Sequence, residues 1–289
     1  MDFIDVSKIY GNYLASAVCK DIAPDDDMYH SGKEWYYSVG ESGLQCVLQS
    51  LCFSKLGTVA SILDLPCGHG RVARHLRAAF PEAQMSFCDL DASGVEFCAH
   101  RFNGTGIHSK PDLTAVALGG PYDVIWIGSL FTHLDFATTK AWLGRLVTSL
   151  SEDGILVATL HGNWSIEVHE QHTPLIHNEG WNHVLKGYRE SGYGYAPFDA
   201  GRPEWGMSLC SPARIVDFVS SLPGVRLLGY TERAWADNHD VLCIARTDRN
   251  KPWGKLKIPM NRQSTLTARN TLRQFLAPHK IIKRLLRKD

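Results

Sequence analysis

The stretch ILDLPCGHGR, residues 62–71, joins an apolar run to a turn that contains two glycines. The run begins at residue 59 and stops at Pro66, a pattern typical of a short buried strand. Helical spacing follows over residues 72–80 and ends before Pro81. Glycines let the backbone bend and let a ligand approach it closely, and the amide groups at a helix start face such a ligand. We therefore predict a strand, a ligand-binding turn and a helix, in this order.

The alternation of strand and helix continues along the chain. Apolar runs typical of strands recur at residues 85–88, 106–109, 122–127 and 155–160, with a helical face over 143–150. Two further runs, 225–232 and 241–246, lie too close together for the crossover that parallel strands need, so we expect an antiparallel hairpin. The sequence therefore predicts an α/β fold: a mostly parallel seven-stranded sheet with an antiparallel terminal hairpin and helices on both faces.

Composition is typical of a globular protein. The 289 residues are 44% hydrophobic and 21% charged, close to the averages of about 45–50% and about 25%. No run approaches the roughly 20 apolar residues of a membrane-spanning helix, and the acidic start MDFIDVSKIY is unlike a secretory signal. The eight cysteines include no C-x-x-C pair and indicate reduced thiols, so we expect a cytoplasmic protein.

The net charge of zero hides an asymmetry between the body and the end of the chain. Residues 251–289 carry 11 Lys/Arg and one acid, which leaves 19 Lys/Arg and 29 acids for the rest. An acidic body repels phosphates, so we expect no nucleic-acid partner. Four large aliphatic residues in the tail share one helical face flanked by cations: Ile281, Ile282, Leu285 and Leu286. This pattern is typical of helices on anionic membranes, and we expect residues 265–289 to contact the inner membrane face or a partner enzyme.

Three regions of the chain differ in composition. We expect residues 1–55 to form a helical cap or lid, residues 56–249 the α/β domain, and residues 250–289 a basic amphipathic tail. Within the domain, residues 161–207 are rich in aromatic residues, and we predict a long irregular insert that acts as a lid or binding loop. The run Gly-Tyr-Gly-Tyr at residues 192–195 suggests an aromatic lid.

Two kinds of cofactor suit the glycine turn. Residues 68–73 match G-x-G-x-x-A, the pattern of dinucleotide sites. Asp64 argues against a dinucleotide, because a carboxylate repels a pyrophosphate but attracts an ammonium group. Asp89 follows the second predicted strand, where an acid can accept both hydroxyls of a ribose. The turn therefore favours a nucleoside cofactor that carries an ammonium group.

The residues Asp64-Leu65-Pro66-Cys67-Gly68-His69-Gly70 resemble the first motif of class I S-adenosylmethionine-dependent methyltransferases, although Pro66 replaces the commoner glycine. Residues 88–91, 122–126 and 153–157 and the terminal hairpin resemble later strands of that family, so the resemblance spans residues 40–246. It implies a Rossmann-like fold with S-adenosyl-L-methionine as cofactor. The cofactor-binding residues that it implies are Asp64, Cys67, Gly68, Gly70, Arg71, Asp89, Leu90, Gly128 and Ser129.

The resemblance also assigns a role to each part of this set. The turn residues and Asp64 would line the methionine part of the cofactor, Asp89 would bind the ribose, and Leu90 would pack beside the adenine. Residues 128–129 would close the site over the sulfonium, and Arg71 would either pair with the cofactor carboxylate or remain solvated.

Three histidines follow predicted strands at the edge where ligands bind in parallel sheets. They are His133, His161 and His239, and we expect one of them to act as a base, since imidazole titrates near neutral pH. Catechol-type methyltransferases that use a metal place an aspartate where Gly128-Ser129 stands here, so we expect no catalytic metal.

The acceptor of the methyl group is the least defined part of the prediction. Residues 128–133 resemble methyltransferases found with bacterial polysaccharide assembly enzymes, which favours O-methylation of a sugar hydroxyl on a glycan or glycan precursor. The alternatives are a small-molecule methyltransferase of secondary metabolism, a non-catalytic membrane-associated scaffold with a methyltransferase-like fold, and a nicotinamide-dependent oxidoreductase. The intact first motif disfavours the scaffold, and Asp64 with the terminal hairpin disfavours the oxidoreductase.

Overall fold

The computed structural model describes residues 3–172 and 174–247. The chain divides into two units, Met1–Asp248 and Arg249–Asp289, and all the described helices and strands belong to the first. The predicted basic tail, with the expected contact through residues 265–289, lies outside the described residues. No helix within the described ranges is long and apolar enough to cross a membrane.

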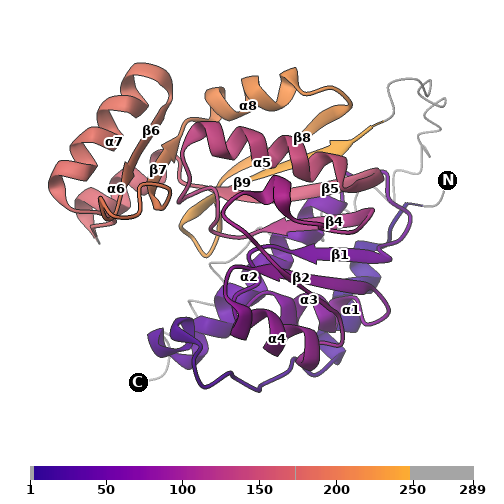
Figure 1. Ribbon diagram of the computed structural model, residues 1–289. Coiled ribbons are helices and arrows are strands. Elements are labelled where there is room, and N and C mark those ends of the chain that lie inside the picture. Colours follow the sequence, from indigo (N-terminus) through magenta and orange to yellow (C-terminus); the bar gives the residue numbers. More distant parts are fainter. Residues whose placement is uncertain (1–2, 173, 248–289) are drawn as a thin grey trace, which may run out of the picture. The chain divides into compact units, whose positions relative to one another are not determined.

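A seven-stranded sheet with the order β3-β2-β1-β4-β5-β9-β8 forms the centre of this unit (Figure 1). The strands are β1 (Ser61–Asp64), β2 (Gln84–Asp89), β3 (Thr105–His108), β4 (Tyr122–Ile127), β5 (Leu150–Leu160), β8 (Val225–Trp235) and β9 (His239–Arg246). The first five pair in parallel, whereas β9 runs antiparallel to both β5 and β8. The predicted sheet and its antiparallel terminal hairpin are thereby confirmed.

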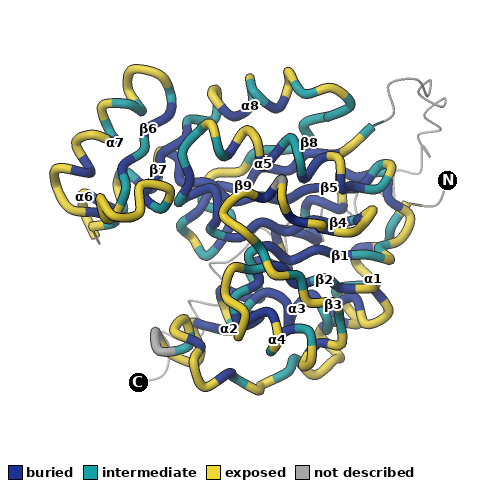
Figure 2. The backbone as a smooth tube through the Cα atoms, viewed as in Figure 1, coloured by how far each residue is buried: buried dark blue, intermediate teal, exposed yellow. Residues whose placement is uncertain are grey.

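Helices cover both faces of the sheet, as predicted. One face packs against α1 (Val6–Ala15), α2 (Lys33–Leu51), α3 (Ala73–Ala79) and α4 (Ala92–Arg101); the other packs against α5 (Phe136–Thr148), α8 (Pro212–Ser221) and the short η2 (Leu113–Ala115). Successive residues of a strand point to opposite faces, so Ile62 belongs to the first core and Leu63 to the second. The central strands are consequently buried on both sides (Figure 2).

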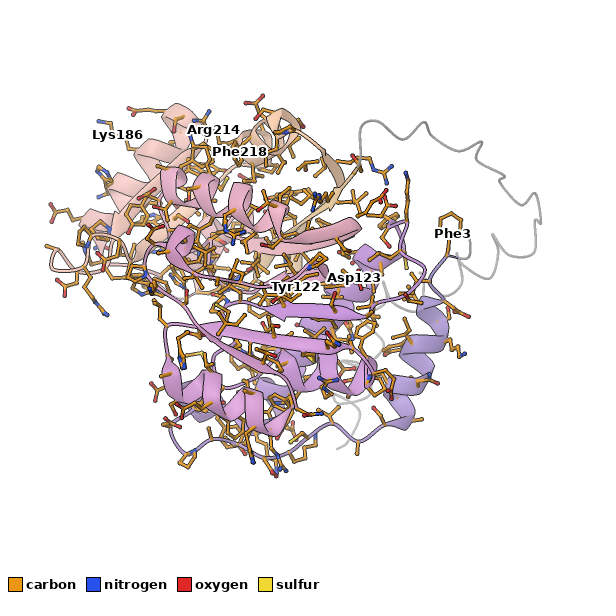
Figure 3. The ribbon with its side chains drawn as sticks, turned by 45° about the vertical axis from the view of Figure 1, so that its right-hand side comes forward. Phe3, Tyr122, Asp123, Lys186, Arg214 and Phe218 are labelled. Atoms are coloured by element: carbon orange, nitrogen blue, oxygen red, sulfur yellow. The ribbon has the colours of Figure 1, made fainter. Side chains whose placement is uncertain are left out.

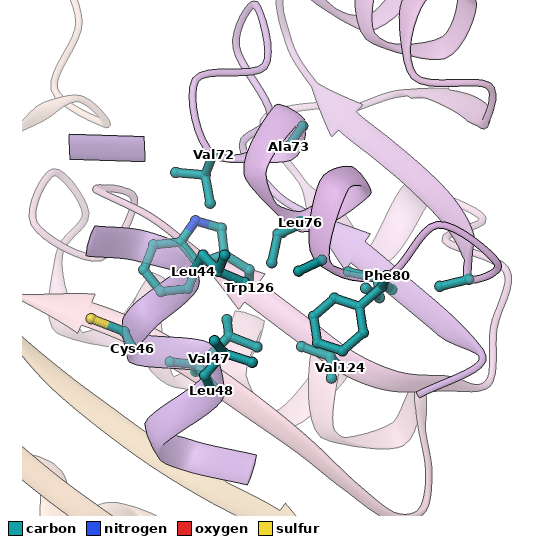
Figure 4. Close-up of a cluster of buried hydrophobic side chains, with 14 of the residues drawn as sticks. Leu44, Cys46, Val47, Leu48, Val72, Ala73, Leu76, Phe80, Val124 and Trp126 are labelled. Atoms are coloured by element: carbon teal, nitrogen blue, oxygen red, sulfur yellow. The ribbon is translucent and has the colours of Figure 1, made fainter. Parts of the chain in front are cut away.

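The first core is centred on Trp126, which is 1% exposed. Leu44 and Leu48 from α2 and Leu76 from α3 pack in the same cluster (Figure 4). The Trp126 ring also meets the edge of the Trp235 ring, with centroids 5.5 Å apart. This tryptophan therefore joins the sheet, two covering helices and the end of β8.

The amino ends of three parallel strands are fastened by one carboxylate. Asp123, at the start of β4 (Figure 3), accepts hydrogen bonds from the backbone amides of Ala60 and Ser61 and from the Ser151 hydroxyl. These bonds connect the entries of β1, β4 and β5. The Asp123 hydrogen bonds lie at the amino edge of the sheet. The loops at the opposite, carboxyl edge contain glycines and polar residues.

The insert at residues 161–207 is ordered into regular elements, and the predicted long irregular stretch is wrong. It comprises α6 (Asn163–Gln171), α7 (Asn178–Ser191) and β6 (Tyr193–Pro197), which pairs with β7 (Gly206–Cys210). Its helices and hairpin enclose a small core of their own, which includes Trp181 and Met207. Gly192 ends α7 at φ 78°, and the buried Tyr193 donates its hydroxyl proton to the Leu134 carbonyl (2.7 Å). Residues 192–195 are therefore part of a helix end and a strand.

Replacing Trp126 by Ala is expected to lower the free energy of unfolding by about 3–5 kcal/mol, because a buried indole leaves a large cavity. Urea unfolding followed by circular dichroism measures this change. Leu14→Ala is the control, since Leu14 lies on α1 and is 64% exposed. A loss below about 1 kcal/mol at Trp126 contradicts its central place in the core.

Candidate cofactor and acceptor site

The glycine turn after β1 has a backbone conformation that favours glycine. Gly68 has φ 47° and Gly70 has φ 81°. A Cβ atom on Gly70 would lie 2.3 Å from the Phe102 ring, and one on Gly94 would lie 2.4 Å from the Gly68 carbonyl oxygen. Helix α4 therefore packs directly on the turn and fixes the direction of its backbone.

Asp89 lies beside this turn, at the carboxyl end of the neighbouring strand β2. Its Oδ2 accepts a hydrogen bond from the Gly68 amide (2.7 Å), and its Oδ1 accepts one from the Asp91 amide (3.0 Å). The next residue, Leu90, is 61% exposed although it is a large apolar side chain. The structure thus brings together the predicted turn, the predicted ribose-binding acid and an uncovered apolar residue.

Asp64 ends β1 immediately before the turn and is 2% exposed. Its Oδ2 has no hydrogen-bond partner among the described residues. Burial, together with the nearby Asp89 charge, raises the pKa of Asp64 well above its usual range. Cys67, 5% exposed, donates its backbone amide to the Cys88 carbonyl, so it fixes the loop between Asp64 and Gly68. A buried carboxyl group without a partner calls for a proton or a cationic ligand group.

The loop after β4 carries the predicted pair Gly128 and Ser129. A Cβ atom on Gly128 would lie 2.8 Å from the Trp126 indole nitrogen. Ser129 adopts φ 58°, and its amide donates to the Thr159 hydroxyl oxygen (2.8 Å) on β5. The loop is therefore bent tightly over Trp126 and tied to the neighbouring strand end.

The three predicted histidines form a row at the same edge of the sheet. The ring centroids of His133 and His161 are 6.4 Å apart, and those of His161 and His239 are 4.7 Å apart. His239 Nδ1 lies 3.3 Å from the Thr159 hydroxyl, whereas His161 Nδ1 has no described partner. Sequence position alone placed them at three separate strand ends, and the parallel sheet brings those ends together.

His133 is the half-buried member of the row. Its Nδ1 lies 2.9 Å from the Gly206 carbonyl oxygen. Since a carbonyl can only accept, Nδ1 carries the proton and Nε2 keeps its lone pair in the neutral ring. Trp205 stacks on this ring with centroids 4.3 Å apart, and Phe198 lies at 5.7 Å. The imidazole is thus held in one tautomer and one plane.

Burial keeps the histidine row uncharged near neutral pH. It lowers the pKa of His133 and lowers that of His239 well below the ordinary value. For His161, burial and then the neighbouring His133 lower the pKa to about 3. The row is therefore a set of neutral imidazoles.

Arg71, the first residue after the turn, has a different setting from the one expected of a solvated side chain. Its guanidinium lies 5.7 Å from the ring centroids of both Trp35 and Trp235. Burial lowers its pKa, while Tyr36 and Asp26 act in the opposite direction. Trp235 in turn meets the His239 ring at 5.0 Å, so Arg71 lies at one end of the histidine row.

Sequence reasoning missed Arg74, which is 1% exposed. Its guanidinium donates to the carbonyls of Gly70, Cys19 and Asp21, and also to the His69 carbonyl and the Tyr36 hydroxyl. The arginine therefore ties the segment between α1 and α2 to the glycine turn. A second tie is Asp25, which lies 3.3 Å from His69 Nε2 and accepts a hydrogen bond from Ser93. No local pattern distinguishes Arg74 from the exposed arginines of other helices.

Two histidines of the insert, outside the row, have structural partners. His169 accepts from the Leu175 amide and stacks on Trp181, and His177 caps the start of α7 by accepting from the Gly180 amide. Residues 3–172 and 174–247 contain no group of three or more His, Cys, Asp or Glu side chains placed to hold a metal ion.

Residues 63–156 match the family model for a methyltransferase domain. This match covers β1 to β5, the strands that carry the turn, Asp89 and the Gly128 loop. Residues 63–156 are therefore similar to a methyltransferase domain, and the fold of the described residues is that of class I S-adenosylmethionine-dependent methyltransferases.

Two curated relatives are malonyl-[acyl-carrier protein] O-methyltransferases. The protein from Acetivibrio thermocellus is 27% identical over 110 residues, which cover 37% of this chain and 38% of that protein. The protein from Hahella chejuensis is 27% identical over 158 residues, which cover 54% of this chain and 50% of that protein. The matched regions thus span half or less of the relatives' length.

A solved structure with the same fold is the plantazolicin methyltransferase BpumL in complex with SAH. It superposes with a TM-score of 0.51 at 13% identity and covers 84% of this chain and 98% of BpumL. At this identity the likeness shows the fold, and the Rossmann-like prediction is confirmed.

Acidification is expected to destabilise this protein partly through His161. In the unfolded chain, His161 binds a proton below about pH 6.5, whereas in the folded protein it does so only near pH 3. Its contribution to the free energy of unfolding is therefore fully present above about pH 6.5 and is lost as the pH falls. Each such proton contributes a slope of about 1.4 kcal/mol per pH unit. Urea unfolding of His161→Leu between pH 6 and 4.5 should show a slope smaller by about this amount.

The exposed His172→Asn is the control for loss of an imidazole. An unchanged slope in His161→Leu contradicts the burial of a neutral imidazole at this position.

Proposed function

We propose that this chain is an S-adenosylmethionine-dependent O-methyltransferase whose cofactor binds at the carboxyl ends of β1 and β2. The observation that carries the proposal is the buried Asp64 beside the glycine turn, whose Oδ2 has no hydrogen-bond partner among the described residues. An α-ammonium group would give this carboxylate the cation that it lacks. A pyrophosphate at the same place would be repelled, which disfavours a nicotinamide dinucleotide.

The remaining cofactor contacts follow from the same edge of the sheet. Asp89 would accept hydrogen bonds from the ribose hydroxyls while it still holds the Gly68 amide. Leu90, exposed in the free protein, would be covered by the adenine. Gly128 and Ser129 would line the space near the sulfonium, where the close approach of Trp126 leaves no room for a Cβ atom.

When bound, S-adenosylmethionine supplies a methyl group on a positively charged sulfur. The neutral histidine row suits this chemistry, because cationic imidazoles would repel the sulfonium. We assign the general base to His133: the Gly206 carbonyl holds its Nδ1 proton, so its Nε2 can accept the proton of an acceptor hydroxyl. Trp205 keeps the ring in plane, and the surrounding aromatic side chains exclude water.

We propose a sugar hydroxyl on a glycan or glycan precursor as the acceptor. The support is the aromatic surface of Trp205 and Phe198 beside His133, since flat rings pack well against the C–H faces of sugars. The second candidate is another small acceptor, favoured by the malonyl-carrier names of the curated relatives. We further propose that residues 1–55 cap the cofactor turn, with Arg74 and Asp25 as the links.

Asp89→Ala is expected to weaken S-adenosylmethionine binding by about 10–150-fold, because hydrogen bonds to a charged group contribute about 1.5–3 kcal/mol. Isothermal titration calorimetry measures this affinity. Asp199→Ala, in the exposed loop between β6 and β7, is the control for loss of one acidic side chain. Unchanged affinity in Asp89→Ala, or tight nicotinamide binding by the wild type, rules out the assignment.

His133→Ala is expected to lower turnover by about 100-fold or more while cofactor affinity stays near the wild-type value. Transfer of a labelled methyl group, with mass spectrometry of candidate acceptors, gives both the rate and the product. His161→Ala and His239→Ala test the rest of the row. Near-wild-type turnover in His133→Ala contradicts the assignment of His133 as the general base.

A further inference from the structure

Three arginines of the same segment have very different surroundings. The Arg74 guanidinium makes five hydrogen bonds, and the Arg77 guanidinium donates to five backbone carbonyls, among them those of Phe102 and Pro81. The Arg71 guanidinium has only the two tryptophan faces, with no hydrogen bond or ion pair among the described residues. A half-buried cation that lacks an anion is costly. Among the described residues, the positive charge of Arg71 is therefore not paired with an acid.

The acid that acts electrostatically on Arg71 already has hydrogen-bond partners. Asp26 accepts a hydrogen bond from the Tyr36 hydroxyl (2.6 Å) and another from the Met28 amide (3.1 Å). Its remaining effect on Arg71 is electrostatic, without a direct contact. The Arg71 guanidinium is therefore left without a paired acid among residues 3–172 and 174–247, and it is available to an anionic ligand.

The position of Arg71 indicates which ligand this is. Trp235 contacts both Arg71 and His239, so the guanidinium lies near the histidine row, which is the proposed acceptor site. On its other side Trp35 is 50% exposed, so this end of the row reaches the protein surface. A guanidinium between two indole rings offers a flat cation whose edge can form paired hydrogen bonds with a carboxylate or a phosphate.

We propose that Arg71, flanked by Trp35 and Trp235, binds an anionic group of the methyl acceptor, so that the natural acceptor carries a carboxylate or a phosphate. This inference rests on the proposed function, and it makes Arg71 a specificity residue at the entrance to the histidine row. A sugar acid, a sugar phosphate and a carboxylic acid each satisfy it, whereas a neutral sugar does not.

The test uses protein saturated with S-adenosylhomocysteine, so that a carboxylate from the cofactor side is already present. Sodium malonate and sodium phosphate are titrated separately, at constant ionic strength set with chloride, and followed by calorimetry and by tryptophan fluorescence. We expect saturable binding of at least one anion by the wild type, at least about tenfold weaker binding by Arg71→Met, and intermediate binding by Arg71→Lys. Comparing the affinities for malonate and for phosphate shows whether Arg71 prefers a carboxylate or a phosphate. Arg189→Met, on the exposed face of α7, should bind like the wild type.

Two results overturn the inference. One is the absence of saturable anion binding by the wild type. The other is a loss of more than about tenfold in S-adenosylhomocysteine affinity in Arg71→Met, which would assign the guanidinium to the cofactor carboxylate. If the wild type does not bind S-adenosylhomocysteine at all, the proposed function fails, and the same titration of the free protein still decides the role of Arg71.

Discussion

The buried guanidinium of Arg74 is the interaction on which the site depends. A charged group with 1% exposure is tolerated only when its hydrogen-bond donors are satisfied. The acceptors come from three places: the glycine turn, the segment between α1 and α2, and Tyr36 on α2. Folding of the glycine turn is therefore coupled to packing of the amino-terminal region, which belongs to the same compact unit as the sheet.

Function follows the groups that the fold leaves without partners. Most buried polar groups here are paired, as folded proteins require, and the exceptions at the carboxyl edge of the sheet have complementary charges or lone pairs. Among the described residues, Asp64 Oδ2 has no partner, Arg71 pairs with no acid, and His133 Nε2 keeps its lone pair. A cofactor with an ammonium group and an acceptor with an anionic group would satisfy the first two, and an acceptor hydroxyl would engage the third.

The strands and their order could be predicted from sequence because buried parallel strands are short apolar runs between strong turn signals. The predicted 122–127 coincides with β4, whereas the predicted 155–160 is shorter than β5, which begins at Leu150. The insert was predicted wrongly, since its many aromatic and glycine residues suggested a loop. In fact Trp181 fills the core of the insert, and Gly192 ends a helix.

The part of the candidate site that lies at strand ends could be predicted from the sequence. Residues at strand ends, such as Asp89 and the three histidines, are brought together by the topology, and the topology is visible in the sequence. The contacts of Arg74 with Tyr36 and of Arg71 with its two tryptophans are not visible, because these partners lie 36 to 164 residues away and are chosen by packing. A crystal structure of the protein with S-adenosylhomocysteine tests the account most directly. We predict its amino group within hydrogen-bond distance of Asp64 and its ribose hydroxyls on Asp89. A ligand bound elsewhere, or an Asp64 that remains without a partner in the complex, would contradict the account.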